Sequence, residues 1–258
     1  MEMRTGQITE VGCTARIRKL NGLLHAARPS LELQRTRVFT KYFSTHESES
    51  QIRKRYFAMA EVYRTLPIRI REGERLLGWQ GEKIRCNNFS IEAHAHWLES
   101  EFDTFETRAF DPWEIAPDDK EELKKIHIPY WKDKTLTSRF IAQTRFPRIL
   151  LESGYVDCGN YISNPGSHFV PDYYELLNIG YKGYYEKCKK IMESLDWTDP
   201  DNVGKWDFYE VMMEVCLGIR DYGQRLCQAA FEEADKQTDP DREKELRQAG
   251  ERCRKICW

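Results

Sequence analysis

The most constraining feature of this sequence is the helical period of its apolar residues near the amino terminus. Along residues 14–65, apolar side chains recur at spacings of three and four, which places them on one face of a helix. Arg28, Pro29 and Ser30 interrupt this pattern, because proline disfavours a helical conformation in the residue before it. The polar run 45–50 interrupts it again. We therefore predict three successive helices here and a largely α-helical fold.

Helical patterns account for most of the remaining chain. Pro117 and the two aspartates after it supply first-turn signals for a helix over 120–126, which Pro129 should end. Asp172 precedes another helix and is its expected N-cap, and Asp239 with the proline after it opens the last one. The other predicted helices cover 88–106, a segment that starts at Leu136, 184–195 and 206–236. No internal repeat at a fixed period is visible.

The segment 67–78 has a different period. Its two isoleucines alternate with two arginines, and a period of two is typical of a strand. Residues 72–74 follow as a turn signal, and two leucines lie beyond them. We predict a short strand, a turn and a second strand, so that the fold class is mainly α with a few short strands.

The size and charge of the chain limit what it does. With 258 residues, of which 40% are hydrophobic, it can bury a sizeable core in one large domain or two modest ones. Its charges nearly cancel to −2, which argues against a nucleic-acid surface, since that requires clustered Lys and Arg. The first residues lack a secretory signal pattern, and no run approaches the roughly 18 apolar residues of a membrane span. The expected location is the cytoplasm.

The cysteines and histidines do not suggest a metal site. Eight cysteines are scattered along the chain, and in a reducing compartment such residues are usually small buried hydrophobes. Cys253 and Cys257 share a face of the last predicted helix, but two further ligands at suitable spacing are lacking. His94 and His96 would suit a metal on a strand and not on the helix predicted there. We expect reduced thiols and no bound metal.

Residues 153–172 form a long stretch without a helical or strand period. They are rich in Gly, Asn, Ser and Pro, and a loop of this length inside a globular domain is often functional. His168 lies in this stretch, between Gly166 and Pro171. Irregular backbone can present its imidazole to a pocket, or the ring can cap the helix that follows Asp172. The residues alone leave both interpretations open.

Several of these segments together resemble the pyruvate formate-lyase family of glycyl radical enzymes, in particular its dehydratase and lyase branches. Residues 67–78, PIRIREGERLLG, are similar to a hairpin motif of that family, with Glu74 in the usual place. Residues 166–183, GSHFVPDYYELLNIGYKG, resemble a second motif. The segment QRT at 34–36 departs slightly from the pattern of an early family helix. The other matching stretches, in the family's order, are 28–40, 106–112, 119–120 and 128–135.

The resemblance implies a fold and a chemistry. Members have a ten-stranded α/β barrel wrapped by helices, and residues 1–258 look like its largely helical amino-terminal part. In this family a separate activase, which uses S-adenosylmethionine and an iron–sulfur cluster, installs a radical on a backbone glycine. The radical passes to a cysteine, whose thiyl removes a hydrogen atom from the substrate. No segment here matches the family's cysteine motif or glycine loop, so we expect this chain to be inactive alone and to bind no cofactor itself.

The same resemblance strengthens the interpretation of His168 as a substrate contact. In the diol and hydroxyproline dehydratases, a histidine at the matching loop position bonds a polar group of the substrate. An imidazole with a pKa of about 6.5 can hydrogen-bond or protonate a departing hydroxyl. The resemblance therefore implies that His168 contacts a small polar substrate, and that Asn160 or Tyr161 is a weaker candidate for the same pocket.

Two kinds of function fit the sequence. The first is the amino-terminal part of a glycyl radical lyase or dehydratase that cleaves a C–O, C–N, C–S or C–C bond, as a truncated or split product that requires a complementary carboxy-terminal chain. The second is a stand-alone, non-catalytic helical module that binds a partner chain, for instance a full-length relative. The apolar end at 256–258 favours the first and predicts an exposed hydrophobic patch. A homodimer would be usual for the family, and the substrate is left open.

Overall fold

The computed structural model describes residues 14–143, 149–150, 153, 155 and 170–258. Helices dominate this part of the chain, with two short strands among them. In the first half the helical elements are α1 (Ala15–Ala26), α2 (Gln34–Thr45), α3 (Gln51–Thr65), α4 (Ile91–Glu101), α5 (Pro117–Glu122), the π-helical turn η1 (Leu123–His127), α6 (Ile128–Trp131) and α7 (Leu136–Gln143). The second half contains α10 (Tyr173–Glu193), the short 3₁₀ turn η2 (Pro200–Asn202), α11 (Val203–Ala234) and α12 (Pro240–Cys257). The predicted fold class, mainly α with a few short strands, is confirmed.

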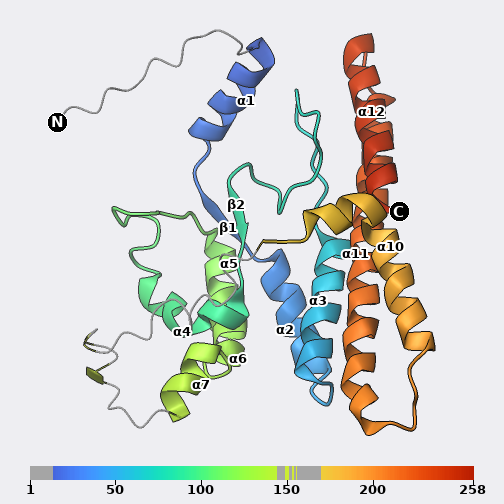
Figure 1. Cartoon of the computed structure of the whole chain (residues 1–258). Helices are drawn as coiled ribbons and strands as arrows, with labels where there is room; N and C mark the ends of the chain where they lie inside the picture. The colour runs from blue at the N-terminus through green and yellow to red at the C-terminus, as the bar shows by residue number, and fades with distance from the viewer. Residues whose placement is uncertain (1–13, 144–148, 151–152, 154, 156–169) are drawn as a thin grey trace, which may run out of the picture.

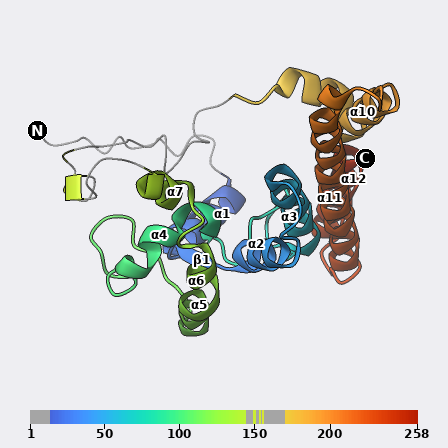
Figure 2. The same cartoon turned by 90° about the horizontal axis from the view of Figure 1, so that it is seen from below.

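The helices are arranged around the pair α2 and α3 (Figure 1). α11 packs along α3 and is itself covered by α10 and α12, whereas the segment from α4 to α7 lies on the other side of α2. Figure 2, seen from below, shows the same separation of the two groups. The three helices predicted for 14–65 are confirmed as α1, α2 and α3.

The helix ends show why several sequence predictions hold. The Asp172 carboxylate accepts a hydrogen bond from the Glu175 amide at 3.0 Å, so Asp172 is the N-cap of α10 as predicted. Asp239 accepts in the same way from the amide of Asp241 at 3.0 Å and begins α12. In both cases a short acidic side chain satisfies an amide that has no partner within the helix.

The prediction that a helix ends at Pro129 is wrong. The helix begins at Pro117, passes through the wider turn η1 and continues through Pro129 to Trp131. In η1 the amide of Ile128 bonds to the carbonyl of Leu123, five residues back. This π-helical turn changes the hydrogen-bond register just before Pro129, so the proline stands in the first turn of α6, where its missing N–H is tolerated.

The predicted strand, turn and strand over 67–78 is also wrong, although the turn is present. The two described strands lie elsewhere, at β1 (Ser30–Glu32) and β2 (Cys86–Asn88), and they pair in parallel. The carbonyls of Arg71 and Glu74 instead accept from the guanidinium of Arg242 on α12, at 3.1 and 2.7 Å. The Arg242 side chain therefore bonds backbone carbonyls that a neighbouring strand would otherwise bond. The alternating pattern of residues 67–78 does not reveal this partner.

The larger hydrophobic core lies between α2, α3, α4 and the α5–α6 segment. Its most buried large side chains include Phe39 of α2, Ile91 and Leu98 of α4, Leu123 of η1 and Ile128 of α6. α3 contributes the smaller side chains of Ala58 and Val62. The core therefore joins segments that are about 90 residues apart in sequence, which is the non-local packing that stabilises a helical domain.

The contact between α3 and α11 is unusually close at one point. A methyl group added to Gly218 would lie 2.8 Å from the Cα and carbonyl oxygen of Ala60. Ion pairs lie on the same interface, from Arg64 to Glu214 at 2.6 Å and to Asp221 at 3.0 Å. Arg225 donates to the carbonyls at the end of α3. A small residue at the crossing and charged residues beside it therefore set the distance between these two helices.

α10 is divided by a kink at Gly180. The backbone there has φ 62° and ψ −178°, a combination that only glycine adopts without strain. The half after Gly180 packs on α11 through the buried Cys188 and Met192. The half before it presents apolar side chains to solvent, with Tyr174 83% and Leu177 85% exposed, and Val170, which lies just before the helix, is 90% exposed. These residues, at and just before the start of α10, are called the exposed stripe of α10 below.

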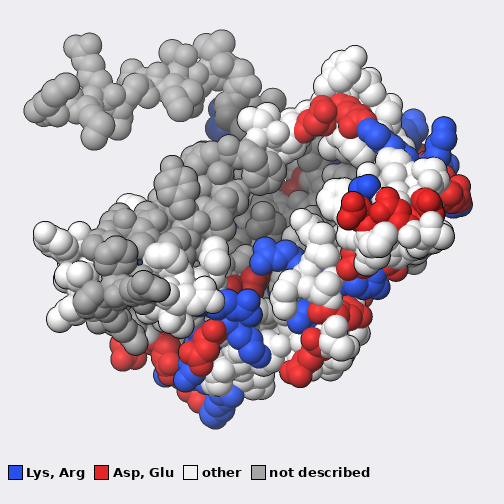
Figure 3. Space-filling view, turned by 60° about the horizontal axis from the view of Figure 1, so that its bottom comes forward, with Lys and Arg blue, Asp and Glu red and all other residues white. Residues whose placement is uncertain are grey.

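The predicted apolar patch at residues 256–258 is only partly present. Ile256 is exposed, whereas the Trp258 ring packs edge-on against Tyr185, with ring centroids 5.4 Å apart, beneath the guanidinium of Arg220. The described surface in Figure 3 carries acidic and basic side chains interspersed, without a large region of one sign. None of the helices described here has the length and apolar composition needed to cross a membrane.

Candidate functional site

The three residues predicted to contact substrate, His168, Asn160 and Tyr161, lie outside the residues that the structure describes. What is described is the carboxyl-terminal side of their segment. There Asp172 caps α10, so the alternative in which His168 is needed to cap this helix is not required. The exposed stripe of α10 follows directly, and His168 therefore precedes, in sequence, an exposed apolar helix surface.

A chain of hydrogen bonds, largely buried, joins α2 to the α5–α6 segment. His127 Nε2 lies 2.9 Å from Glu122 Oε1, and His127 Nδ1 lies 2.8 Å from Thr40 Oγ1. Trp131 Nε1 donates to the same hydroxyl at 2.9 Å. A carboxylate only accepts, so Nε2 carries the proton of its contact with Glu122. Both imidazole nitrogens therefore have partners.

The far end of this network is closed by Arg37. Its Nε and Nη2 donate to Glu122, and its Nη2 also donates to Asp119 at 2.7 Å. The hydrogen bond from Arg37 is the main cause that holds the pKa of Glu122 at about 2, below its usual 4.5, and burial opposes it. Thr40, His127 and Glu122 resemble a hydroxyl–imidazole–carboxylate relay, but a tryptophan and an arginine occupy its two ends. The network therefore fastens α2 to the α5–α6 segment and offers no access to a substrate.

The lowered pKa of Glu122 predicts a pH-dependent contribution to stability. Because the folded-state pKa is below the unfolded value, the contribution is fully present above pH 4.5 and is lost as the pH falls toward about 2. We expect Arg37→Met to be less stable than the original chain at pH 7 and the difference to shrink through this window. Urea unfolding at several pH values measures it. Arg28→Met, in an exposed pair with Glu114, is the matched control, and a difference that stays constant with pH would contradict the assignment.

A second buried contact links α2 with α4. Arg35 and Glu92 form a two-point ion pair, with Nη1 to Oε2 at 2.8 Å and Nη2 to Oε1 at 2.5 Å. Only 13% and 10% of the two side chains are exposed, and the guanidinium lies 4.0 Å above the ring of Phe39. No pattern in the sequence predicts this pair. Its only signal was that Arg35 belongs to a segment that resembles a family motif.

The hairpin motif at 67–78 is held by its own acid. Glu74 is buried, and its Oε2 accepts from the amide of Arg71 at 2.9 Å. The Arg71 guanidinium lies 4.4 Å above the ring of Trp79 and donates to the carbonyl of Glu82 at 2.7 Å. The side chains of Glu74 and Arg71 therefore both hold the loop in its conformation. These contacts give the motif a structural role.

The remaining candidates from the sequence are packing residues. The His94 ring packs at a tilt against Phe89 and edge-on against Trp97. Burial lowers the pKa of His94 and His96. The described cysteines are unpaired, and burial raises their pKa values, that of Cys216 to about 11. Within the described ranges no three His, Cys, Asp or Glu side chains converge as metal ligands. The side chain of Cys257 lies outside the described groups.

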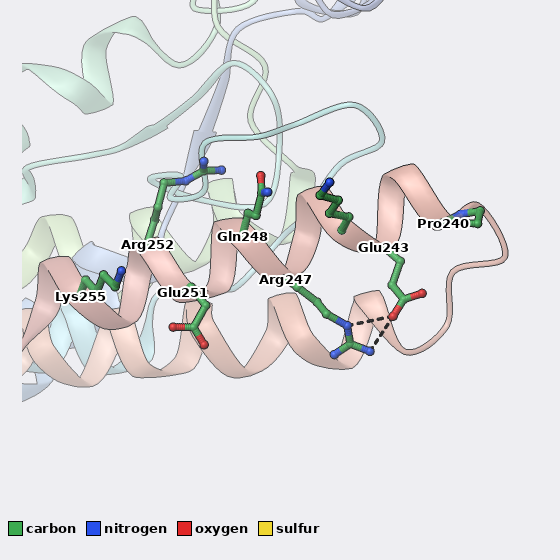
Figure 4. Close-up of a pocket in the computed structure, with 8 residues that line it drawn as sticks. Pro240, Glu243, Arg247, Gln248, Glu251, Arg252 and Lys255 are labelled. Carbon is green, nitrogen blue, oxygen red and sulfur yellow. Dashed lines mark hydrogen bonds and ion pairs between the residues drawn. The ribbon is translucent and has the colours of Figure 1, made fainter.

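The surface grooves of the described residues include three that are lined by helix side chains. One runs along the outer face of α12, where Figure 4 shows alternating charges, with Arg247 bonded to Glu243 and Lys255 at the other end. Such a row of opposite charges at helical spacing is an ordinary solvated face. Another lies between α11 and α12. The third, beside α1, is the most apolar and is lined by leucines, a tryptophan and arginines.

The helical architecture and the two motifs define a class of protein, the glycyl radical enzymes with a pyruvate formate-lyase fold. The family model described as pyruvate formate lyase-like matches residues 9–257. The chain therefore belongs to the pyruvate formate lyase-like family, and the resemblance inferred from the sequence is confirmed.

Similar proteins include enzymes of known structure and activity. Isethionate sulfite-lyase from Nitratidesulfovibrio vulgaris is 26% identical over 237 residues, which cover 88% of this chain and 28% of that protein. A structure from Roseburia inulinivorans concerned with 1,2-propanediol dehydration is 31% identical, with a TM-score of 0.87, and 95% of this chain matches 31% of it. The glycerol-bound B12-independent glycerol dehydratase from Clostridium butyricum is 28% identical, with a TM-score of 0.86 over 95% of this chain and 31% of that one. The chain thus spans less than a third of the length of these relatives.

Proposed function

We propose that this chain is the amino-terminal part of a glycyl radical dehydratase or lyase that cleaves a C–O or C–S bond of a small polar substrate. The observation that carries the proposal is the family match over residues 9–257, together with the likeness to a glycerol dehydratase, a propanediol-dehydrating enzyme and a sulfite-lyase. In this proposal residues 1–258 form one amino-terminal unit of a pyruvate formate-lyase-type domain. The assembled enzyme works in the cytoplasm, where family members are often dimers.

The radical chemistry in this proposal belongs to a polypeptide portion that corresponds to the rest of the relatives' length. It would supply the cysteine and the glycine, and a separate activase that uses S-adenosylmethionine would install the glycyl radical. The positions of the described cysteines support the proposal that the radical cysteine lies in the other portion of the enzyme. Cys188, Cys216, Cys227 and Cys253 lie within helices and Cys86 lies in β2, whereas the resemblance places the radical cysteine in a loop.

A direct test is radical formation on this chain alone. We expect the isolated chain, incubated anaerobically with a glycyl radical activase, S-adenosylmethionine and a reductant, to show no glycyl radical signal in electron paramagnetic resonance. The Clostridium butyricum glycerol dehydratase, with its own activase, is the positive control. A doublet from the isolated chain would mean that one of its own glycines stores the radical, and the proposed division of work would be wrong.

Within the assembled enzyme, His168 is proposed to bind the substrate and to hold a proton near the departing group, with Asn160 or Tyr161 beside it. A histidine suits this task because its pKa of about 6.5 allows it to donate at neutral pH. We expect His168→Ala to lower kcat/KM by about 100-fold or more in the complete enzyme, since a general acid contributes roughly 10²–10⁴-fold. His168→Gln should recover part of the loss in KM, because it still donates a hydrogen bond.

The control for this experiment is His25→Ala, which changes an exposed histidine at the end of α1. It should leave the kinetics unchanged. Turnover of His168→Ala equal to that of His25→Ala would reject the pocket role while leaving the family assignment intact. The losses of kcat/KM in Asn160→Ala and Tyr161→Phe, compared with the loss in His168→Ala, rank the three residues by their contribution to catalysis.

The exposed stripe of α10 also suits the alternative, a non-catalytic helical module that binds a partner chain. Val170, Tyr174 and Leu177 stand clear of the described chain and could contact a complementary polypeptide in either case. The two functions are separated by the coding sequence after codon 258. An in-frame or adjacent reading frame with the cysteine and glycine loops supports the enzyme, and a genomic context without them supports the module.

A further inference from the structure

The groove between α1 and the 71–84 loop, called the α1 groove below, has the composition of a binding site for a small amphiphile. Its volume is about 510 Å³, within the range of ligand pockets. One wall is the apolar face of α1, with Ile17, Leu20 and Leu24. The opposite wall is made by Leu76, Trp79 and Ile84.

The apolar walls of the α1 groove are not filled by the described chain. No residue of α1 is buried, although the helix carries four apolar side chains on its groove side. Leu24 is 43% exposed and Leu76 is 82% exposed. α1 is held at its rim instead, by Arg16 Nη1 donating to the carbonyl of Gly73 at 3.2 Å and by the exposed pair Lys19–Glu72. A ligand that covers these leucines would gain the free energy of burying apolar surface.

Two of the three arginines that line the α1 groove are paired with acids. Arg71 is paired with Glu74, and Arg75 with Glu245 of α12, which Arg242 shares. Arg16 is half-buried, and among the described residues its hydrogen bond goes to the carbonyl of Gly73 and not to an acid. A guanidinium without an acidic partner at the groove complements a monoanion.

We propose that the α1 groove binds an aliphatic carboxylate, whose chain lies along Leu20, Leu24 and Leu76 and whose carboxylate pairs with Arg16. A neutral chain lacks the ion pair, and an ammonium head repels the guanidinium, so the site discriminates by the sign of the head group. The proposal is independent of the radical chemistry, because the α1 groove contains none of the residues assigned to it.

The test is isothermal titration calorimetry of the whole chain with octanoate, 1-octanol and octylammonium. We expect saturable binding of octanoate with a Kd of about millimolar or tighter, weaker binding of octanol and none of octylammonium. Arg16→Gln should weaken octanoate about tenfold and leave octanol unchanged, because one charge-assisted hydrogen bond is lost. Leu24→Gln should weaken both octanoate and octanol.

Two matched variants keep the result specific. Arg18→Gln changes an exposed arginine on the same helix, and Leu177→Gln changes an exposed apolar residue on α10; both should leave octanoate binding as it was. Circular dichroism establishes that each variant is folded. The proposal is overturned if octanoate shows no saturable binding in the millimolar range, if octylammonium binds equally well, or if Arg18→Gln weakens octanoate as much as Arg16→Gln does.

Discussion

Glu92→Gln is expected to lower the free energy of unfolding by about 3 kcal/mol, because it leaves the Arg35 guanidinium as a buried charge without its counter-ion. Only 13% of the Arg35 side chain is exposed, so water does not replace the lost carboxylate. The remaining contacts of this guanidinium, to the carbonyl of Phe89 at 3.5 Å and over the ring of Phe39, are weaker than a two-point ion pair. Urea unfolding at pH 7 measures the loss.

A double variant separates the cost of an unpaired charge from the value of the pair. Arg35→Met combined with Glu92→Met should recover most of the stability lost in Glu92→Gln, since apolar side chains of similar length often replace a buried pair without loss. Glu114→Gln removes the exposed partner of Arg28 and should change stability by less than about 1 kcal/mol. Equal losses in Glu92→Gln and Glu114→Gln would show that the Arg35–Glu92 pair is solvated in solution.

Gly218→Ala is expected to destabilise the chain by about 1–3 kcal/mol, although alanine favours helices more than glycine does. The added methyl group would lie 2.8 Å from the Cα and carbonyl oxygen of Ala60, and backbone atoms of a packed helix do not yield as a flexible side chain would. α3 and α11 would have to move apart, which weakens the ion pairs of Arg64 on the same interface. Thermal unfolding followed by circular dichroism measures the effect.

Gly204→Ala is the matched control for Gly218→Ala. Gly204 lies on the same helix, and a methyl group added there meets no atom within 4 Å. It should leave stability unchanged or raise it by up to about 1 kcal/mol, because only helix propensity changes. A loss of similar size at both positions would mean that close contact with Ala60 is not the cause.

The sequence predicts the helices well because their signals are local. The spacing of apolar residues identifies α1, α2 and α3, and Asp172 and Asp239 mark two helix starts through a hydrogen bond to an amide two or three residues away. The two errors have different causes. Pro129 continues a helix because η1 changes the hydrogen-bond register before it. The extended 67–78 segment has no strand partner because Arg242, about 170 residues away, bonds its carbonyls.

For the candidate site, too, the sequence predicts local features and does not predict contacts between distant residues. The motifs at 67–78 and 166–183 identified the family, which the match over 9–257 confirms. His168, Asn160 and Tyr161 lie outside the described residues, so their role stays a prediction. The contacts that hold the described framework, Arg35 with Glu92 and Thr40 with His127, join residues 57 and 87 positions apart. No spacing rule predicts such a pair, because it depends on how helices cross.

The sequence by itself determined the class of this protein, its helical content and most helix starts, since these follow from periodicity, capping and motif residues close together in the chain. Only the tertiary structure decided that Glu74 and the Thr40–His127–Glu122 network are structural, that apolar residues at the start of α10 are exposed, and that an apolar groove lined in part by Arg16 lies beside α1. The physical reason is that burial and charge balance are properties of a packed surface, to which residues far apart in sequence contribute together.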